Sequence, residues 1–113
     1  MPISPDIFNQ VKTKIAEGTL ASDWQLLAIY GDGEKAYKKL DPDGFLLITL
    51  YKSGRIGLCR YPQDDRLDAI MVVFNPDGSR MKTSFDPEKK VKKKMDLVLS
   101  EQLAATMMRE LAG

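Results

Sequence analysis

The sequence predicts an α+β domain with an N-terminal helix, an antiparallel meander of five or six strands and a C-terminal helix. Apolar residues recur at helical spacing near the start, give way to strand-like runs separated by turn motifs, and return to helical spacing at the end. The 113 residues are of ordinary size for one domain, and 43% of them are apolar, which is enough for one hydrophobic core. We therefore treat residues 1–113 as a single domain.

The first helix is predicted to begin after Ser4, whose hydroxyl suits the N-cap position, with Pro5 in the first turn. Gly18 supplies a C-terminal stop, because glycine readily takes the left-handed conformation found at helix ends. Between them, apolar side chains recur at helical spacing; they are Ile7, Phe8, Val11 and Ile15. One stripe of this helix therefore needs a partner surface.

Turn motifs divide the middle of the chain into strands. Two turns contain Pro-Asp-Gly, at 41–44 and 75–78, and two more are predicted at 52–55 and 62–65. The segment 34–40 fits either a strand or a short helix, and we expect a strand. The other predicted strands are 24–30, 45–51, 55–61, 67–74 and 79–85.

Two of these runs, 45–51 and 67–74, are apolar at consecutive positions, so both sides of each strand are apolar. The two helices can cover one face of the sheet. The other face needs strong curvature, a loop or a second subunit, and we expect a homodimer to cover it.

The end of the chain fits two arrangements. In one, a single helix spans 87–112. In the other, a strand over 95–99 is followed by a helix over 101–111 with Ser100 as its N-cap. We favour the second arrangement.

Several absences narrow the function. The chain has no histidine, which removes the commonest general base and the commonest transition-metal ligand. Cys59 is the only cysteine, so neither an intrachain disulfide nor a multi-cysteine zinc site can form. We therefore expect a protein that is not an enzyme and that needs no cofactor or metal. The start of the chain has no signal-peptide pattern and no apolar run is long enough to span a bilayer, so we expect a cytoplasmic protein without membrane contact.

Three features that resemble sites have simpler explanations. The segment 31–36 has the glycine spacing of a dinucleotide fingerprint, but its carboxylates would face the pyrophosphate and no parallel crossover follows. The tightest carboxylate group, Asp64, Asp65 and Asp68, is equally explained by a turn. Cys59 is expected to be a buried, inert thiol.

Aromatic and methionine side chains are expected to serve mainly in packing. In strands, aromatic residues are most often core residues or cross-strand partners rather than platforms for stacked bases. In the last helix we expect Met107 in the core and Met108 beside it, off the buried stripe. The aromatic residues concerned are Trp24, Tyr37, Tyr51 and Tyr61.

The charges are segregated along the chain although the net charge is only +1. Seven basic residues lie within 79–95 against two acidic ones, a local net charge of +5 that leaves −4 for the rest. Arg80 and Lys82 share one side of the predicted strand. We call the basic residues of this stretch the basic patch and predict them as binding residues: Arg80, Lys82, Lys89, Lys90, Lys92, Lys93 and Lys94.

Two classes of function remain. The first is a small non-enzymatic protein-interaction module, such as an adaptor, an inhibitor or an immunity-type protein, with a protein partner and a polarised basic surface. The second is a nucleic-acid-binding module that uses the stretch 80–94, because lysines neutralise phosphates. A net charge near zero is untypical of a protein whose whole surface binds nucleic acid, so we place the protein-interaction class first.

Overall fold

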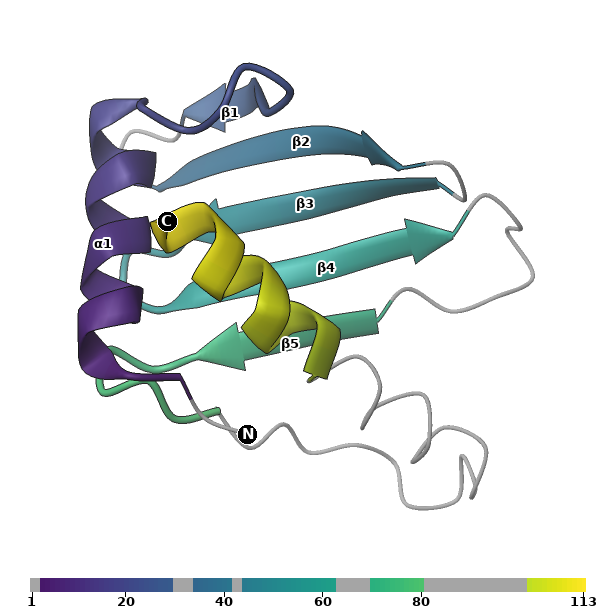
Figure 1. Ribbon diagram of the computed structural model, residues 1–113. Helices are drawn as coiled ribbons and strands as arrows, with labels where there is room; N and C mark the ends of the chain where they lie inside the picture. Colours follow the sequence, from purple (N-terminus) through teal and green to yellow (C-terminus); the bar gives the residue numbers. More distant parts are fainter. Residues whose placement is uncertain (1–2, 30–33, 42–43, 63–69, 81–101) are drawn as a thin grey trace, which may run out of the picture.

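The computed structural model is an α+β fold in which a helix, a five-stranded antiparallel sheet and a second helix follow one another along the chain (Figure 1). It describes residues 3–29, 34–41, 44–62, 70–80 and 102–113. The strands lie in the sheet in sequence order, so the predicted meander is confirmed. Their bounds are β1 (Gln25–Ile29), β2 (Lys35–Asp41), β3 (Gly44–Leu50), β4 (Ile56–Pro62) and β5 (Ile70–Phe74).

The first helix, α1, spans Pro5–Glu17 and has both predicted ends. The Ser4 side-chain oxygen accepts a hydrogen bond from the Ile7 N–H at 3.2 Å, which satisfies one of the unpaired donors of the first turn. Gly18 ends the helix with a φ of 72°, in the left-handed region. Its buried stripe consists of Phe8, Val11 and Ile15.

The segment 34–40 is a strand, as expected, because β2 pairs with β1 on one side and with β3 on the other. Of the predicted strand 79–85, Arg80 forms a single bridge to Phe74. The remaining parts of the predictions at 67–69, 81–85 and 95–101 lie outside the described residues.

The strand register decides which residues share a face of the sheet. Tyr37, Ile48, Leu58 and Val72 are neighbours across four strands and therefore point to the same side. All strand residues of the main core cluster belong to that side, which we call the helix-covered face. They are Tyr37, Ile48, Leu50, Ile56, Leu58, Val72 and Phe74.

Both helices lie on this face, α1 near one end of the strands and the C-terminal helix, residues 102–112, across their middle (Figure 1). Lys14 joins them, since its Nζ donates to the Leu111 carbonyl at 2.8 Å. A cation is favourable there because carbonyl groups at a helix C-terminus have no partner within the helix. The described helices include none long and apolar enough to cross a membrane.

The C-terminal helix corrects one expectation. Met108 is fully buried with Ala104 and Ala105, whereas Met107 is only partly buried at the edge of the core. The helix faces the sheet through its two small alanines, so the buried stripe is centred one position later than the apolar spacing suggested, and Met108 fills the space beside them.

Of the two Pro-Asp-Gly turns, Gly78 has the predicted left-handed geometry, whereas Gly44 has a φ of 150° and begins β3. The turn at 52–55 also contains a left-handed glycine. Gly54 has a φ of 86° and Gly78 a φ of 88°. At Gly78 the N-terminal segment crosses the turn, and the Ile3 N–H donates to the Gly78 carbonyl at 3.0 Å. A Cβ on Gly78 would overlap the Ile3 carbonyl oxygen, whereas the nearest atom to a Cβ on Gly54 is the Lys12 Nζ at 3.9 Å.

Candidate protein-interaction surface

The second face of the sheet carries no helix or strand of the described residues, and we call it the open face. Its residues alternate with those of the helix-covered face. The positions from β2 to β5 whose side chains the structure describes are Ala36, Lys38, Leu40, Phe45, Leu47, Thr49, Gly57, Cys59 and Val73. Most are apolar, but Ala36, Gly57, Cys59 and Val73 are buried, so the accessible apolar part of this face consists mainly of Leu40, Phe45 and Leu47.

Exposure on the open face is greatest above β2 and β3. Leu40 is 76% exposed, and its cross-strand neighbour Phe45 is half-buried, as are Leu47 and Thr49. The Lys38 Nζ lies 4.4 Å from the centre of the Phe45 ring, which holds a cation next to this apolar area.

Tyr51 covers the opposite end of the same face. A Cβ on Gly57 would lie 2.7 Å from Cε2 of Tyr51, so the ring lies directly over this glycine of β4. Burial raises the pKa of the Tyr51 hydroxyl above its ordinary value, and the nearby Cys59 and Glu34 raise it further. Gly57 thus leaves room for an aromatic ring to extend the apolar surface.

Opposite charges flank the centre of the open face along β2. Glu34, Ala36 and Lys38 are spaced by two residues and so point to the same side of the sheet. Glu34 is half-buried, and its Oε1 accepts a hydrogen bond from the Lys52 N–H at 3.1 Å, which fixes the carboxylate beside Tyr51. Lys38 is half-buried at the other end, beside Phe45. The anion and the cation therefore lie on either side of Ala36.

The edge of the sheet at β1 is also apolar. Leu26 is 50% exposed and Leu27 is 57% exposed. Next to this strand, Lys39 forms an ion pair with Asp23 at 3.0 Å, and its Nζ lies 5.9 Å from the centre of the Trp24 ring. The hydrogen bond from Lys39 lowers the pKa of Asp23.

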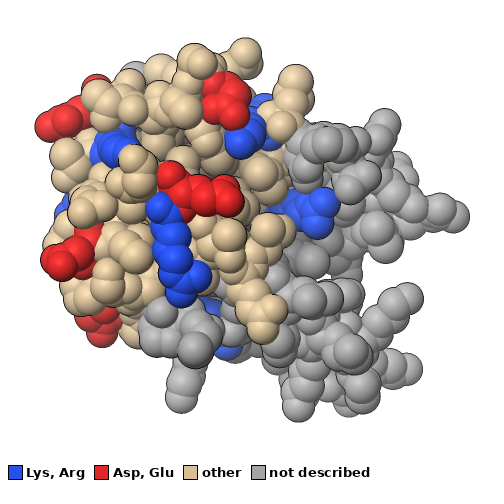
Figure 2. Space-filling view, in the orientation of Figure 1, with Lys and Arg blue, Asp and Glu red and all other residues tan. Residues whose placement is uncertain are grey.

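The basic patch is described only at Arg80, which is half-buried and forms the bridge to Phe74. Its six other members lie outside the described residues: Lys82, Lys89, Lys90, Lys92, Lys93 and Lys94. On the part of the molecule that Figure 2 colours by charge, Lys and Arg are interspersed with Asp and Glu. The described residues therefore bring no second basic side chain of the patch next to Arg80.

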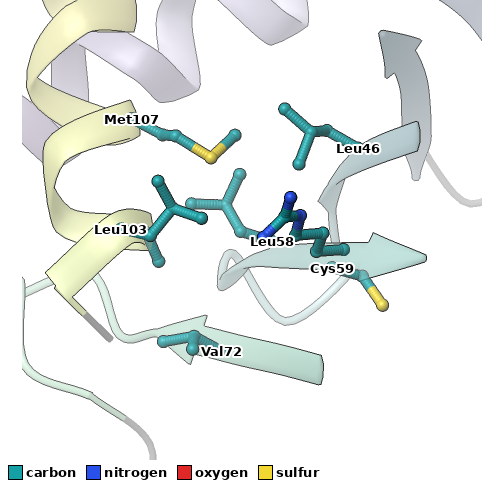
Figure 3. Close-up of a pocket in the computed structure, with 8 residues that line it drawn as sticks. Leu46, Leu58, Cys59, Val72, Leu103 and Met107 are labelled. Atoms are coloured by element: carbon teal, nitrogen blue, oxygen red, sulfur yellow. The ribbon is translucent and has the colours of Figure 1, made fainter. Parts of the chain in front are cut away.

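The other features singled out in the sequence serve mainly in packing. Trp24 and Tyr37 are buried in the core, as expected. Cys59 is buried, and its sulfur points away from the helices, toward the open face (Figure 3). The segment from Lys35 is a strand rather than the helix that a dinucleotide site requires. The group around Asp64 lies outside the described residues.

A shallow groove lies at the edge of the contact between the C-terminal helix and the sheet. Leu103 and Met107 of the helix point toward Leu46, Leu58 and Val72 (Figure 3). The space that a water-sized sphere can occupy there is about 20 Å³, and Arg60 lines it. Sites for drug-sized ligands usually exceed about 300 Å³, so this groove is better explained as imperfect packing at the helix edge.

Sequence reasoning missed the charge arrangement on β2 and the apolar edge at β1. The two-residue spacing of Glu34 and Lys38 was a usable signal once 34–40 was taken as a strand. The absence of charge in β1 was another.

No protein-family model, curated protein or solved structure matches this chain.

Proposed function

We propose that the protein is a non-enzymatic protein-interaction module that forms a homodimer through the open face of its sheet. The observation that carries the proposal is an apolar face with Glu34 and Lys38 placed symmetrically about Ala36. An isologous interface needs a surface that is complementary to itself, and this arrangement meets that requirement.

The complementarity follows from a simple two-fold geometry. Two copies can stack open face to open face about a two-fold axis that lies midway between the sheets. If this axis runs parallel to the sheets, crosses the strands at right angles and passes over Ala36, each β2 lies antiparallel over the β2 of the other copy. Lys38 then faces Glu34 of the other copy, and the reverse pair forms at the same time. Because sheets pack at about 30° to each other, the alignment holds near the axis and diverges away from it.

The adjacent strand supports the same axis. Thr49 pairs with Ala36 in the sheet, so it also lies at the axis. Leu47 and Tyr51 are two residues on either side of Thr49 and face each other across the two copies. An apolar pair therefore accompanies each charge pair.

The size of the face predicts the strength of the dimer. Five strands spaced by about 4.8 Å, each with some seven residues at roughly 3.3 Å, present roughly 500 Å². Because Ala36, Gly57, Cys59 and Val73 of this face are already buried, two such faces bury less than about 1,000 Å², which is the size of a weak interface. We therefore expect a dissociation constant in the micromolar range, about 10⁻⁶ to 10⁻⁴ M.

A charge-exchange series tests the proposal by sedimentation equilibrium at about 10 to 500 μM. Lys38→Glu and Glu34→Lys should each weaken the dimer, by about tenfold or more, because like charges then face each other. The double variant should restore most of the affinity. Lys12→Glu, on the outer side of α1, is the matched control and should leave the dimer unchanged, since Lys12 is exposed on the other side of the molecule.

Two results would refute the proposal. One is a wild-type protein that remains monomeric throughout this concentration range. The other is a dimer whose affinity responds equally to Lys38→Glu and Lys12→Glu, because a general charge effect would then explain the change.

The segregated charge of the basic patch supports a second candidate function, binding to nucleic acid through phosphate contacts. If it is correct, replacing Lys92, Lys93 and Lys94 with Gln should reduce the slope of log affinity against log salt by about 2 to 3. Absence of binding to single- or double-stranded DNA or RNA at about 50 mM salt would exclude it, because screening is weak there.

A further inference from the structure

Tyr51 directly follows β3, and the turn that leads to β4 fixes its backbone. Its N–H donates to the Arg55 carbonyl at 2.9 Å, and its own carbonyl accepts a hydrogen bond from the Gly54 N–H, also at 2.9 Å. Because the backbone is held on both sides, the direction of the ring depends only on the side-chain torsions.

The ring crosses from β3 to β4. A Cβ on Gly57 would lie 2.7 Å from Cε2, 2.9 Å from the hydroxyl oxygen and 3.2 Å from Cζ of Tyr51. These three atoms belong to the hydroxyl end of the ring, so this end lies over Gly57, in the space that a larger residue would fill. Tyr51 is only half-buried there, so part of its ring is accessible on the open face.

Gly57 lies beneath the symmetry axis of the proposed homodimer. It pairs with Thr49, which pairs with Ala36, so the three residues form one row across the sheet. An axis that crosses the strands at right angles over Ala36 therefore also passes over Gly57. A group close to a two-fold axis lies close to its own symmetry mate, and stacked sheets are only about 10 Å apart. The hydroxyl ends of the two Tyr51 rings are therefore expected to meet.

We propose that the two Tyr51 rings meet at the axis of the homodimer and are the site at which a one-electron oxidant joins the two chains through a dityrosine bond. The inference rests on the proposed homodimer and adds a covalent modification to it. A freely diffusing monomer has no second Tyr51 beside the first, so the reaction reports the assembled interface.

The reaction balances as follows from the chemistry of phenols. An external one-electron oxidant removes an electron from each of the two phenols, and each phenol releases its hydroxyl proton to water. The two phenoxyl radicals then form a carbon–carbon bond between ring carbons adjacent to the hydroxyl groups. The hydrogen on each of these carbons returns to the oxygen, which restores both phenols. Two electrons have passed to the oxidant and two protons to water.

The other tyrosines and the nearby thiol determine the controls. Of the four tyrosines, Tyr37 is only 8% exposed beneath the helices. The side chains of Tyr30 and Tyr61 lie outside the described residues, so their phenylalanine variants serve for comparison. Cys59 is close to Tyr51, and a thiol can return a hydrogen atom to a phenoxyl radical. The reaction is therefore run in a Cys59→Ser background.

The test oxidises this protein at about 100 μM, where the expected dissociation constant leaves much of it dimeric. The oxidant is generated by illuminating a ruthenium tris-bipyridyl complex with persulfate. A covalent dimer two hydrogen atoms lighter than two chains should form, and peptide mapping should place its cross-link between two copies of residue 51. Tyr51→Phe should lose most of this product, whereas Tyr30→Phe and Tyr61→Phe should retain it.

Sedimentation equilibrium separates the failure of this site from the failure of the homodimer. Phenylalanine keeps the ring, so Tyr51→Phe should still dimerise, and its lost cross-link then reports the missing hydroxyl. A protein that sediments as a dimer but couples through another tyrosine, or does not couple, would overturn this inference and leave the homodimer intact. A protein that remains monomeric would overturn both.

Discussion

Ile48 and Leu47 are consecutive residues of β3, and they occupy different environments. Ile48 is completely buried beneath the helices, while Leu47 is half-buried on the open face. The chain supplies the apolar partner of the first residue from its own helices. In the proposed homodimer the second residue would contact the other copy, so one side of β3 would serve folding and the other side binding.

The largest expected effect is the difference between the losses in stability when Ile48 and Leu47 are each replaced by alanine. Ile48→Ala should destabilise the fold by about 2 to 5 kcal/mol, because it leaves a cavity in a closed core. Leu47→Ala should cost less, about 1 kcal/mol in the monomer, since Leu47 is only partly buried. Urea unfolding at low micromolar concentration measures both. Equal losses would show that the two faces are covered to the same degree.

A second contrast concerns how the N-terminal segment is held against the sheet on the helix-covered side. Gly78→Ala should cost about 3 kcal/mol, because its Cβ meets the Ile3 carbonyl and the left-handed backbone adds strain. Gly54→Ala has nearly the same φ and open space, so it should cost only about 1 kcal/mol. Similar losses by thermal unfolding would mean that the contact with Ile3 contributes nothing.

On the open face, Gly57 should tolerate substitution by alanine better than Gly78 does. A Cβ on Gly57 meets the ring of Tyr51, but this ring is the end of a side chain that can swing away. We expect Gly57→Ala to cost about 1 kcal/mol or less in the monomer while weakening the dimer, because the displaced ring no longer faces Leu47 of the other copy. A loss of stability as large as that of Gly78→Ala would argue that Tyr51 is fixed by the fold itself.

The smallest expected effect is the change in stability when Tyr51 ionises. Its pKa is raised in the folded protein, mainly by burial, so the unfolded state loses the proton first as the pH rises. The associated stability is present below about pH 10 and is lost as the pH rises through the folded pKa. An absorbance titration should show a tyrosine component that ionises late, and Tyr51→Phe should remove that component. A wild-type titration identical to that of Tyr51→Phe would contradict this environment.

Most of the described fold could be predicted from local signals. The Ser4 cap, the Gly18 stop and the Pro-Asp-Gly turn at 75–78 depend only on residues that are close together in the chain, so they can be predicted from the sequence alone. The burial of Met108 could not be predicted in this way. It depends on the angle at which the helix meets the sheet, which the alanines at 104 and 105 permit through close approach.

The candidate binding surfaces were harder to predict from the sequence than the fold. The run at 45–51 correctly indicated that both sides of β3 are apolar, while only positions 72–74 of the run at 67–74 have described side chains. Which side the helices cover was identified only by the register. The basic patch can be recognised in the sequence because its residues are close together along the chain, whereas Glu34 and Lys38 form a pattern only once they are placed on one side of β2.

Cross-linking at the proposed symmetry axis tests the central claim most directly. In a Cys59→Ser background, Thr49→Cys places a thiol where the two copies should meet, and Thr13→Cys places one on the exposed side of α1 as a control. A short bismaleimide should convert most of the Thr49→Cys protein to a covalent dimer at about 100 μM and little of the Thr13→Cys protein. Equal yields at the two positions would contradict a dimer formed through the open face.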